Sequence, residues 1–283
     1  MNIGEALSNR RTFIVGSAKN AGKTAFLNYA LAQLPPEKTA FLTIGVDGEK
    51  TDLVFGNPKP AVLSREGGIF LTTDRLLAAS DGGHEILEAY PFKTVLGRLV
   101  LARAVRGGFV EIAGPENNAQ LALILAQLES DYGVKTALID GAANRITPVA
   151  SMDGSCFVYV ARIERVNFAS SLDGLRLVDA LSRVPVVKKP RGNAVVIEGA
   201  LTPEKLSLTG AQTVHVSVED CTKIFLGFRE WVSASKKYKI SFRNDFKHLF
   251  SVLVLKDVSR QEVEAVLGRE ILRKTVFNPY AES

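Results

Sequence analysis

The sequence predicts an α/β protein in which a mostly parallel sheet carries helices on both faces, with extra strands toward the C-terminus. Compact apolar runs typical of buried strands alternate with segments of helical spacing over the first two-thirds of the 283 residues. This alternation favours parallel pairing, because each helix returns the chain across the sheet. A hydrophobic content of 46% is also ordinary for a protein with a well-developed core.

The expected elements follow from apolar patterning and from turn residues. We expect strands at 12–15, 39–44, 94–104, 109–114, 135–141 and 155–162, and helices starting at 23 and spanning 117–130 and 167–182. The segment 52–75 is rich in Gly and Pro with short β-prone stretches, which predicts a hairpin-like insertion or arm. From about residue 191 the regular alternation of strands and helices ends. We expect strands at 194–201, 213–218, 238–243 and 249–255 and helices at 219–235 and 259–268.

Composition excludes several classes of protein. Two separated cysteines in apolar surroundings are typical of reduced, buried thiols, and the three scattered histidines lack metal-ligand spacing. The net charge of +5 is too diffuse to indicate nucleic acid, and the KKPR run at 188–191 is typical of a solvated loop. No apolar run approaches the roughly 18 residues that span a bilayer, and the start of the chain has no apolar signal region. We therefore expect a cytoplasmic protein that binds neither nucleic acid nor membrane.

The stretch TFIVGSAKNAGKTAFLN at 12–28 carries the most chemical information. It predicts a strand, a loop of small residues and an amphipathic helix in direct succession, which is the arrangement of a phosphate-binding loop (P-loop). Small residues let successive N–H groups turn toward phosphate oxygens, Lys23 would reach the β- and γ-phosphates, and the Thr24 hydroxyl would join the shell of Mg²⁺. The expected nucleotide-binding residues are Gly16, Ser17, Ala18, Lys19, Asn20, Ala21, Gly22, Lys23, Thr24 and Ala25.

The loop reads G-x-x-x-x-x-G-K-T, one residue longer than the usual G-x-x-x-x-G-K-[ST] pattern, because Ser17 stands where the first Gly is expected. This longer spacing resembles the loop of dethiobiotin synthetases and related dimerising P-loop proteins. On this basis we expect residues 1–190 to form a P-loop nucleotide-binding domain. Residues 191–283 would either extend the same sheet or form a small appended α/β lobe.

Acidic residues at the ends of predicted strands are candidates for the metal and for the attacking water, because ligands of open α/β sheets collect there. Asp47 follows the second strand in IGVDGE, Glu111 lies in FVEIAG, and Asp140 ends TALID. Asp140 has the form of a Walker B residue. Glu111 resembles the magnesium ligand of dethiobiotin synthetases, and Asp47 resembles the switch aspartate of that class. Each one could instead cap a turn.

Four segments together, VGSAKNAGKT, TIGVDGEKTDLVFGNPKP, GGFVEIAGPENN and ALIDGAANR, resemble the nucleotide-binding subunit of the lysine 5,6-aminomutase reactivase. The resemblance covers roughly the first 185 residues and returns in VEDCTKIFL and in the FNP near the C-terminus. It implies an ATPase that works beside a second reactivase subunit on an adenosylcobalamin-dependent enzyme, releasing damaged cobalamin so that intact cofactor can bind.

Three functions follow as hypotheses, one of them a nucleotide-binding regulator that barely hydrolyses ATP. The first is a Mg²⁺-dependent ATPase of the reactivase type, in which Lys23 and the loop amides bind phosphate, Thr24, Glu111 and Asp140 surround the metal, and Asp47 positions water. The alternative is an ATP-dependent carboxylate ligase or small-molecule kinase of the dethiobiotin synthetase type, with residues 52–75 forming either a substrate pocket or a partner-binding arm. ATP is favoured over GTP because no Asn-Lys-x-Asp guanine motif is visible. A homodimer is compatible with each of these functions.

Overall fold

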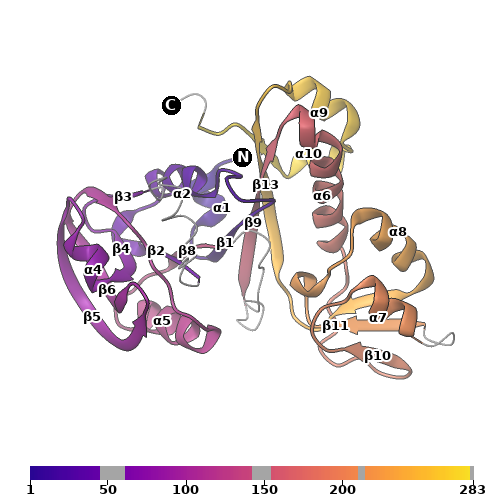
Figure 1. The fold of residues 1–283 in the computed structure, drawn as a ribbon, viewed down its shortest axis with the longest axis horizontal. Coiled ribbons are helices and arrows are strands. Elements are labelled where there is room, and N and C mark those ends of the chain that lie inside the picture. Colours follow the sequence, from indigo (N-terminus) through magenta and orange to yellow (C-terminus); the bar gives the residue numbers. More distant parts are fainter. Residues whose placement is uncertain (45–60, 142–153, 210–213, 281–283) are drawn as a thin grey trace. The chain divides into compact units, whose positions relative to one another are not determined.

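The computed structural model describes residues 1–44, 61–141, 154–209 and 214–280, and contacts divide the chain into two compact units. Unit 1 comprises residues 1–16, 22–142 and 279–283, and unit 2 comprises 17–21 and 143–278. In Figure 1 most of unit 1 is coloured indigo to magenta and most of unit 2 pink to yellow. The main boundary between the units therefore falls near residue 143, whereas the pattern of predicted strands and helices placed a domain boundary near residue 191.

Unit 1 is built on six adjacent strands in the order β1-β8-β2-β4-β6-β5. The first four strands pair in parallel, and β6 and β5 add to them in antiparallel fashion. Helices α2 and α5 lie on opposite sides of the parallel strands (Figure 1). The elements are α1 Ile3–Leu7, β1 Arg11–Gly16, α2 Lys23–Ala32, the 3-10 turn Pro36–Lys38, β2 Thr39–Thr43, β3 Val62–Ser64, β4 Ile69–Thr73, α4 Asp74–Ala78, β5 Gly83–Thr94, β6 Gly97–Arg106, β7 Gly108–Val110, α5 Asn118–Ser130 and β8 Thr136–Asp140.

The central strands of unit 1 are buried along nearly their whole length. In β1 every residue after Arg11 is buried, and in β2 and β8 all but the last residue are buried. Continuous burial of this kind is the pattern of parallel strands that are covered on both faces, which is why their sequences read as unbroken apolar runs. The predicted α/β class with a mostly parallel, helix-flanked sheet is confirmed.

Two sequence expectations in unit 1 are wrong. Residues 109–114 do not form a continuous buried strand: β7 ends at Val110 and pairs with β3 in a separate two-stranded antiparallel sheet, and Glu111 is exposed. Part of the segment expected to be an insertion or arm is instead β4, whose five residues are all buried. The apolar pattern identified both stretches as β-prone but contained no information about which strands they would pair with.

The C-terminal Tyr280 belongs to unit 1 and packs against the helix that follows the loop. Its ring meets that of Tyr29 in α2 edge to face, with ring centroids 6.1 Å apart. Burial raises the pKa of the Tyr280 hydroxyl to about 12. The same helix is fixed to the β3 segment through Asn28, whose side chain accepts from Leu63 N and donates to the carbonyl of Ala61. The larger part of unit 2, residues 143–278, thus lies in the sequence between β8 and Tyr280.

Unit 2 contains two groups of parallel strands. One has the order β14-β13-β9, and the other is a three-stranded sheet in the order β10-β11-β12. The elements are β9 Ser155–Ile163, the 3-10 turn Arg165–Asn167, α6 Phe168–Leu181, β10 Ala194–Ile197, α7 Pro203–Leu208, β11 His215–Val218, the 3-10 turn Cys221–Lys223, α8 Phe228–Lys237, β12 Lys239–Phe242, β13 Lys247–Leu255, α9 Arg260–Val266, α10 Arg269–Arg273 and β14 Thr275–Phe277.

The helix expected at 219–235 is wrong in its first half. Only a 3-10 turn occupies residues 221–223, and α8 begins at Phe228. The intervening residues pair with Leu201: its N–H donates to the carbonyl of Lys223, and its own carbonyl accepts from Phe225 N. Backbone groups used in this bridge cannot also form helical hydrogen bonds. Gly227 then caps α8, with its N–H donating to the Glu230 carboxylate.

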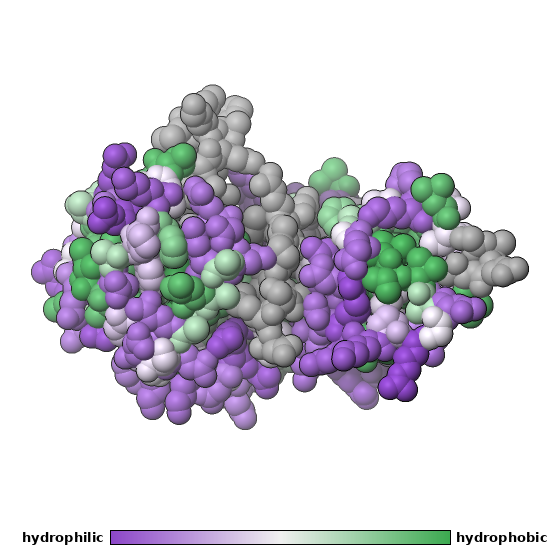
Figure 2. Space-filling view, turned by 90° about the horizontal axis from the view of Figure 1, so that it is seen from below, coloured by the Kyte–Doolittle hydropathy of each residue, from purple (hydrophilic) through white to green (hydrophobic). Residues whose placement is uncertain are grey.

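The surface of the chain is mixed in character. Exposed apolar side chains include Ile86, Leu208 and Phe225. On the face shown in Figure 2, hydrophobic residues lie among hydrophilic ones. Apolar atoms contribute much of any folded protein's surface, so scattered examples carry no function by themselves. Among the residues that the structure describes, no helix combines the length and the apolar character needed to cross a bilayer.

His248 in β13 makes the stability of unit 2 depend on pH. Its side chain is 6% exposed, and burial, assisted by the ammonium of Lys274, lowers its pKa from 6.5 to about 4, against opposing effects of Asp179 and the backbone of Phe250. The unfolded chain binds a proton at this site between pH 6.5 and 4 and the folded chain does not, so stability falls as pH falls through that window.

We expect the contribution of His248 to the free energy of unfolding to decrease by about 2 kcal/mol when the pH is lowered from 7.5 to 5. The chain's single tryptophan, Trp231, lies in the core of unit 2 and reports its unfolding in urea by fluorescence. In His248→Gln the loss of stability over this range should be smaller than in the wild type by about that amount. Equal losses in both proteins would show that the imidazole does not carry this dependence.

Candidate functional site

The loop after β1 turns sharply before α2 begins. Asn20 and Gly22 both adopt left-handed backbone conformations, with φ of 62° and 99°. Asparagine tolerates this region better than most side chains, and glycine enters it without steric cost. Right- and left-handed residues in close succession turn backbone N–H groups toward one side, which forms a concavity suited to an anion. The left-handed backbone conformations therefore explain why Asn and Gly occupy positions 20 and 22 of the predicted phosphate loop.

The first turn of α2 presents unsatisfied N–H groups next to this loop. Its N-cap is Gly22, which has no side chain to accept a hydrogen bond, and its first turn contains no acidic residue. By contrast, the first turn of α5 in the same unit is capped by Asn117, whose side chain accepts from Gln120 N. Free N–H groups and the positive end of the helix dipole make the start of α2 suitable for a phosphate.

Side chains along the loop differ in exposure. Ala18, Lys19 and Asn20 are exposed, Ala21 is buried, and Lys23 and Thr24 are half-buried at the start of α2. Ala25, which also starts the helix, is exposed. The exposed stretch leaves the loop backbone accessible to a ligand. The half-buried side chains of Lys23 and Thr24 pack partly against the rest of the unit.

The beginning of the loop is anchored through Ser17, which belongs to unit 2 by its contacts. Its N–H donates to the carbonyl of Val160 in β9 at 2.8 Å, and its side chain hydrogen-bonds with Tyr159. Burial raises the pKa of Tyr159 to about 12, partly offset by this bond to Ser17. Because its amide is already engaged, Ser17 is not available to donate its backbone N–H to phosphate, although it was expected to bind the nucleotide.

Asp140 lies at the edge of the sheet where β1 passes into the loop. It is the last residue of β8 and pairs in register with Ile14 of β1 and Thr43 of β2. Its carbonyl accepts from the Thr43 hydroxyl at 3.0 Å and from Ile44 N at 3.2 Å. Carboxyl ends of parallel strands gather at one edge of a sheet, so this half-buried carboxylate is at the level where the phosphate loop starts.

Glu111 is placed differently from Asp140. Its carbonyl accepts from the Thr72 hydroxyl of β4 at 2.7 Å, and its side chain is exposed. In the strand order β8-β2-β4, Thr72 is two strands away from Asp140, a separation of about 10 Å across the sheet. The sequence pattern around Glu111 predicted a continuous buried strand, which the structure does not contain, and the proposed contact of this carboxylate with the metal stays a prediction.

Asp47 and the metal ligands are the remaining parts of the predicted site. Asp47 lies outside the described residues. Within the described ranges, no three His, Cys, Asp or Glu side chains come together as a metal-binding group. Mg²⁺ in nucleotide sites is commonly held by one or two protein oxygens together with phosphate oxygens and water. Thr24 and Asp140 fit that donor chemistry, because one offers a hydroxyl and the other a carboxylate.

Comparison of the chain with protein-family models, with curated proteins and with solved structures gives no match. The resemblance to the reactivase subunit therefore rests on the four sequence segments quoted above.

Proposed function

We propose that the chain is a Mg²⁺-dependent nucleoside triphosphate hydrolase that uses ATP. The observation that carries the proposal is the succession of β1, a loop with left-handed Asn20 and Gly22, and an uncapped α2 that opens with Lys23 and Thr24. Asp140 ends the strand next to β1 and adds the carboxylate that such a site requires.

Each residue then has a separable role. Lys23 and the free amides at the start of α2 hold the β- and γ-phosphates, and the Thr24 hydroxyl joins the metal shell. Asp140 holds a water of that shell or the metal itself. Asp47 is proposed to orient the attacking water. When bound, Mg²⁺ neutralises charge that develops on the phosphates.

The resemblance supports a more specific role as the ATPase subunit of a reactivating factor for an adenosylcobalamin-dependent aminomutase. In that role ATP binding and hydrolysis would shift loops between two arrangements, and a second subunit would respond to them. Stimulation of hydrolysis by a protein partner would favour this role. Stimulation by a small carboxylic acid would favour the dethiobiotin synthetase type of ligase instead.

Replacing Asp140 by Asn should raise the Mg²⁺ concentration needed for half-maximal binding of a fluorescent ATP analogue by at least about tenfold, because one anionic oxygen of the metal shell is lost. Binding would be titrated with Mg²⁺ at fixed nucleotide concentration. Asp81→Asn is the matched control, since it removes a carboxylate from an exposed position of the same unit. Equal Mg²⁺ requirements in all three proteins would remove Asp140 from the metal site.

A further inference from the structure

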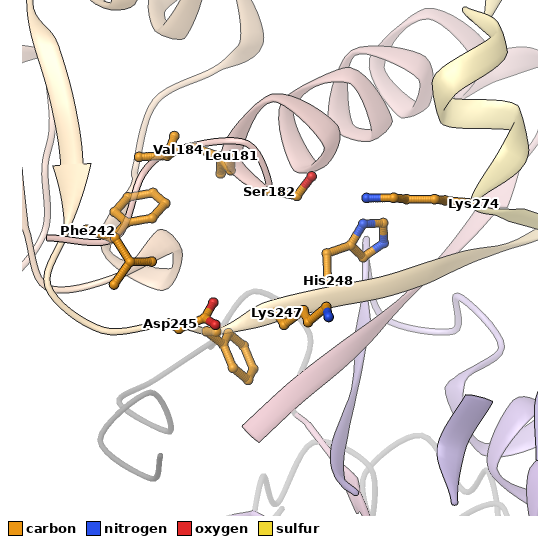
Figure 3. A pocket seen from close by; sticks show the side chains of 10 residues that line it. Leu181, Ser182, Val184, Phe242, Asp245, Lys247, His248 and Lys274 are labelled. Atoms are coloured by element: carbon orange, nitrogen blue, oxygen red, sulfur yellow. The ribbon is translucent and has the colours of Figure 1, made fainter. Parts of the chain in front are cut away.

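Unit 2 contains a pocket of about 100 Å³ whose walls come from the end of α6, the end of β12 and the start of β13. One wall is apolar and is formed by Leu181, Val184 and Phe242, and the other carries polar and charged groups (Figure 3). Its volume corresponds to about three water molecules or a small organic ion. Every residue that lines it belongs to unit 2, and none belongs to the phosphate loop.

The imidazole of His248 is the central polar group of this pocket. The ring is held in place by Phe157, with ring centroids 5.1 Å apart, and by a 3.1 Å hydrogen bond between its Nε2 and the Ser251 hydroxyl. Its Nδ1 is buried and has no partner at hydrogen-bonding geometry among the described groups, while the backbone of Phe250 makes a polar contact with the ring that raises its pKa. Buried polar atoms without partners are uncommon, because the lost contact with water is not replaced.

The hydrogen bond to Ser251 is compatible with either neutral tautomer of His248, because a hydroxyl can donate or accept. Within the described part of the chain, the Ser251 hydroxyl has His248 Nε2 as its one hydrogen-bond partner. In the tautomer in which the hydroxyl donates to Nε2, Nδ1 carries the hydrogen of the neutral ring. In Figure 3 the ring faces Lys274 and Ser182, and in this tautomer His248 presents a donor to the pocket.

The charges around the pocket favour an anion. Lys274 reaches over the ring in Figure 3, and it forms no ion pair with a described carboxylate. The nearby Asp179 is already paired with Arg183 at 2.6 Å. At the rim, the exposed Lys247 and Asp245 balance each other in charge. The ammonium of Lys274 is therefore the unbalanced charge of the site.

The C-terminal end of α6 does not compete for this ammonium. Its last carbonyls, at residues 178–181, already accept hydrogen bonds from the N–H groups of Ser182, Arg183 and Val184 and from the Ser182 hydroxyl. Satisfied carbonyls offer little to an additional cation. Lys274 and His248 thus lie on the polar side of the pocket, opposite an apolar wall.

We propose that this pocket binds a small organic anion whose carboxylate or phosphate group accepts from Lys274 Nζ and His248 Nδ1 and whose short apolar part lies against Leu181, Val184 and Phe242. The charge-assisted bond from Lys274 supplies most of the affinity, and the fixed imidazole sets the orientation of the anion. The small volume excludes a nucleotide, so the site is separate in chemistry from the proposed ATP site.

The test titrates the full-length protein with isobutyrate and, separately, with inorganic phosphate, while NMR follows the imidazole ¹⁵N signals. The chain has three histidines, and His248→Gln identifies the signal of His248 by its disappearance. We expect a saturable shift of His248 Nδ1 with at least one probe, and the probe that binds more tightly shows whether the site prefers carboxylate or phosphate. Phosphate that binds elsewhere does not produce a saturable shift at this nitrogen.

Lys274→Met should weaken this binding at least tenfold, because it keeps the length of the side chain and removes its charge. Lys274 is exposed, so the variant should fold, and Trp231 fluorescence checks that unit 2 is intact. Lys236→Met is the matched control at an exposed position of the same unit and should bind as the wild type does. The absence of a saturable shift with both probes, or equal affinities in wild type and Lys274→Met, would overturn the proposal.

Discussion

Replacing Lys23 by Ala is expected to lower the rate of ATP hydrolysis by at least about 100-fold, equivalent to about 2.7 kcal/mol of transition-state stabilisation. The lysine stands at the first position of α2, directly after the left-handed Gly22, where its ammonium can reach phosphates held by the loop. Catalysis of phosphoryl transfer depends on positioning and on charge stabilisation, and the variant removes the proposed positive charge. Phosphate release would be measured with Mg²⁺ and either ATP or GTP.

Lys38→Ala is the control for this experiment, because Lys38 is exposed in unit 1 and lies outside the loop. It should hydrolyse ATP at the wild-type rate. If Lys23→Ala retains the wild-type rate, the loop is not the catalytic phosphate site. A wild type that is inactive with both nucleotides would exclude an autonomous ATPase and leave partner-stimulated hydrolysis as the remaining form of the proposal.

Replacing Gly114 by Ala is expected to destabilise unit 1 by about 1–3 kcal/mol. An added Cβ would collide with the carbonyl oxygen of Thr43 at the end of β2 and would lie 2.6 Å from its carbonyl carbon. Both atoms belong to the backbone of a central strand, so neither can move without breaking the pairing of β2 with β8. The change should appear as a lower midpoint of thermal unfolding followed by circular dichroism.

Gly83→Ala is the matched control for this substitution. Gly83 lies in β5 of the same unit, and an added Cβ there would meet Arg106 Cβ at 3.7 Å, an ordinary van der Waals contact. Its midpoint should stay close to that of the wild type. If Gly114→Ala unfolds at the same temperature as Gly83→Ala, the chain passes Thr43 less closely than described here. Gly114→Ala should also weaken nucleotide binding, because β2 lies next to Asp140.

The sequence predicted best those elements whose signals are local. The apolar runs at β1, β2 and β8 and the spacing of α6 each point to one structure, and capping side chains mark the starts of α5 and α9. Elements that depend on distant partners were predicted poorly. The bridge to Leu201 shortens the helix expected at 219–235, and pairing with β3 diverts the chain at β7. Local propensity contains no information about such partners.

The same distinction applies to the two sites. Lys23 and Thr24 lie within one motif, so their spacing in the sequence is sufficient to place them together. Asp140 could be placed with them because it ends a predicted parallel strand. His248 and Lys274 come together through the parallel pairing of β13 with β14, in which Ser251 stands opposite Thr275. That register is a property of the folded sheet, and the sequence has no short-range signal for it.

The contact between Tyr29 and Tyr280 has a consequence for synthesis on the ribosome. At typical rates of translation, roughly ten to fifty seconds separate the addition of these two residues. Residues 143–278 of unit 2 are made within this interval, while α2 lacks its contact with Tyr280. The unit that the ribosome starts first is therefore completed last, and α2 acquires its contact with Tyr280 only after that residue has left the exit tunnel.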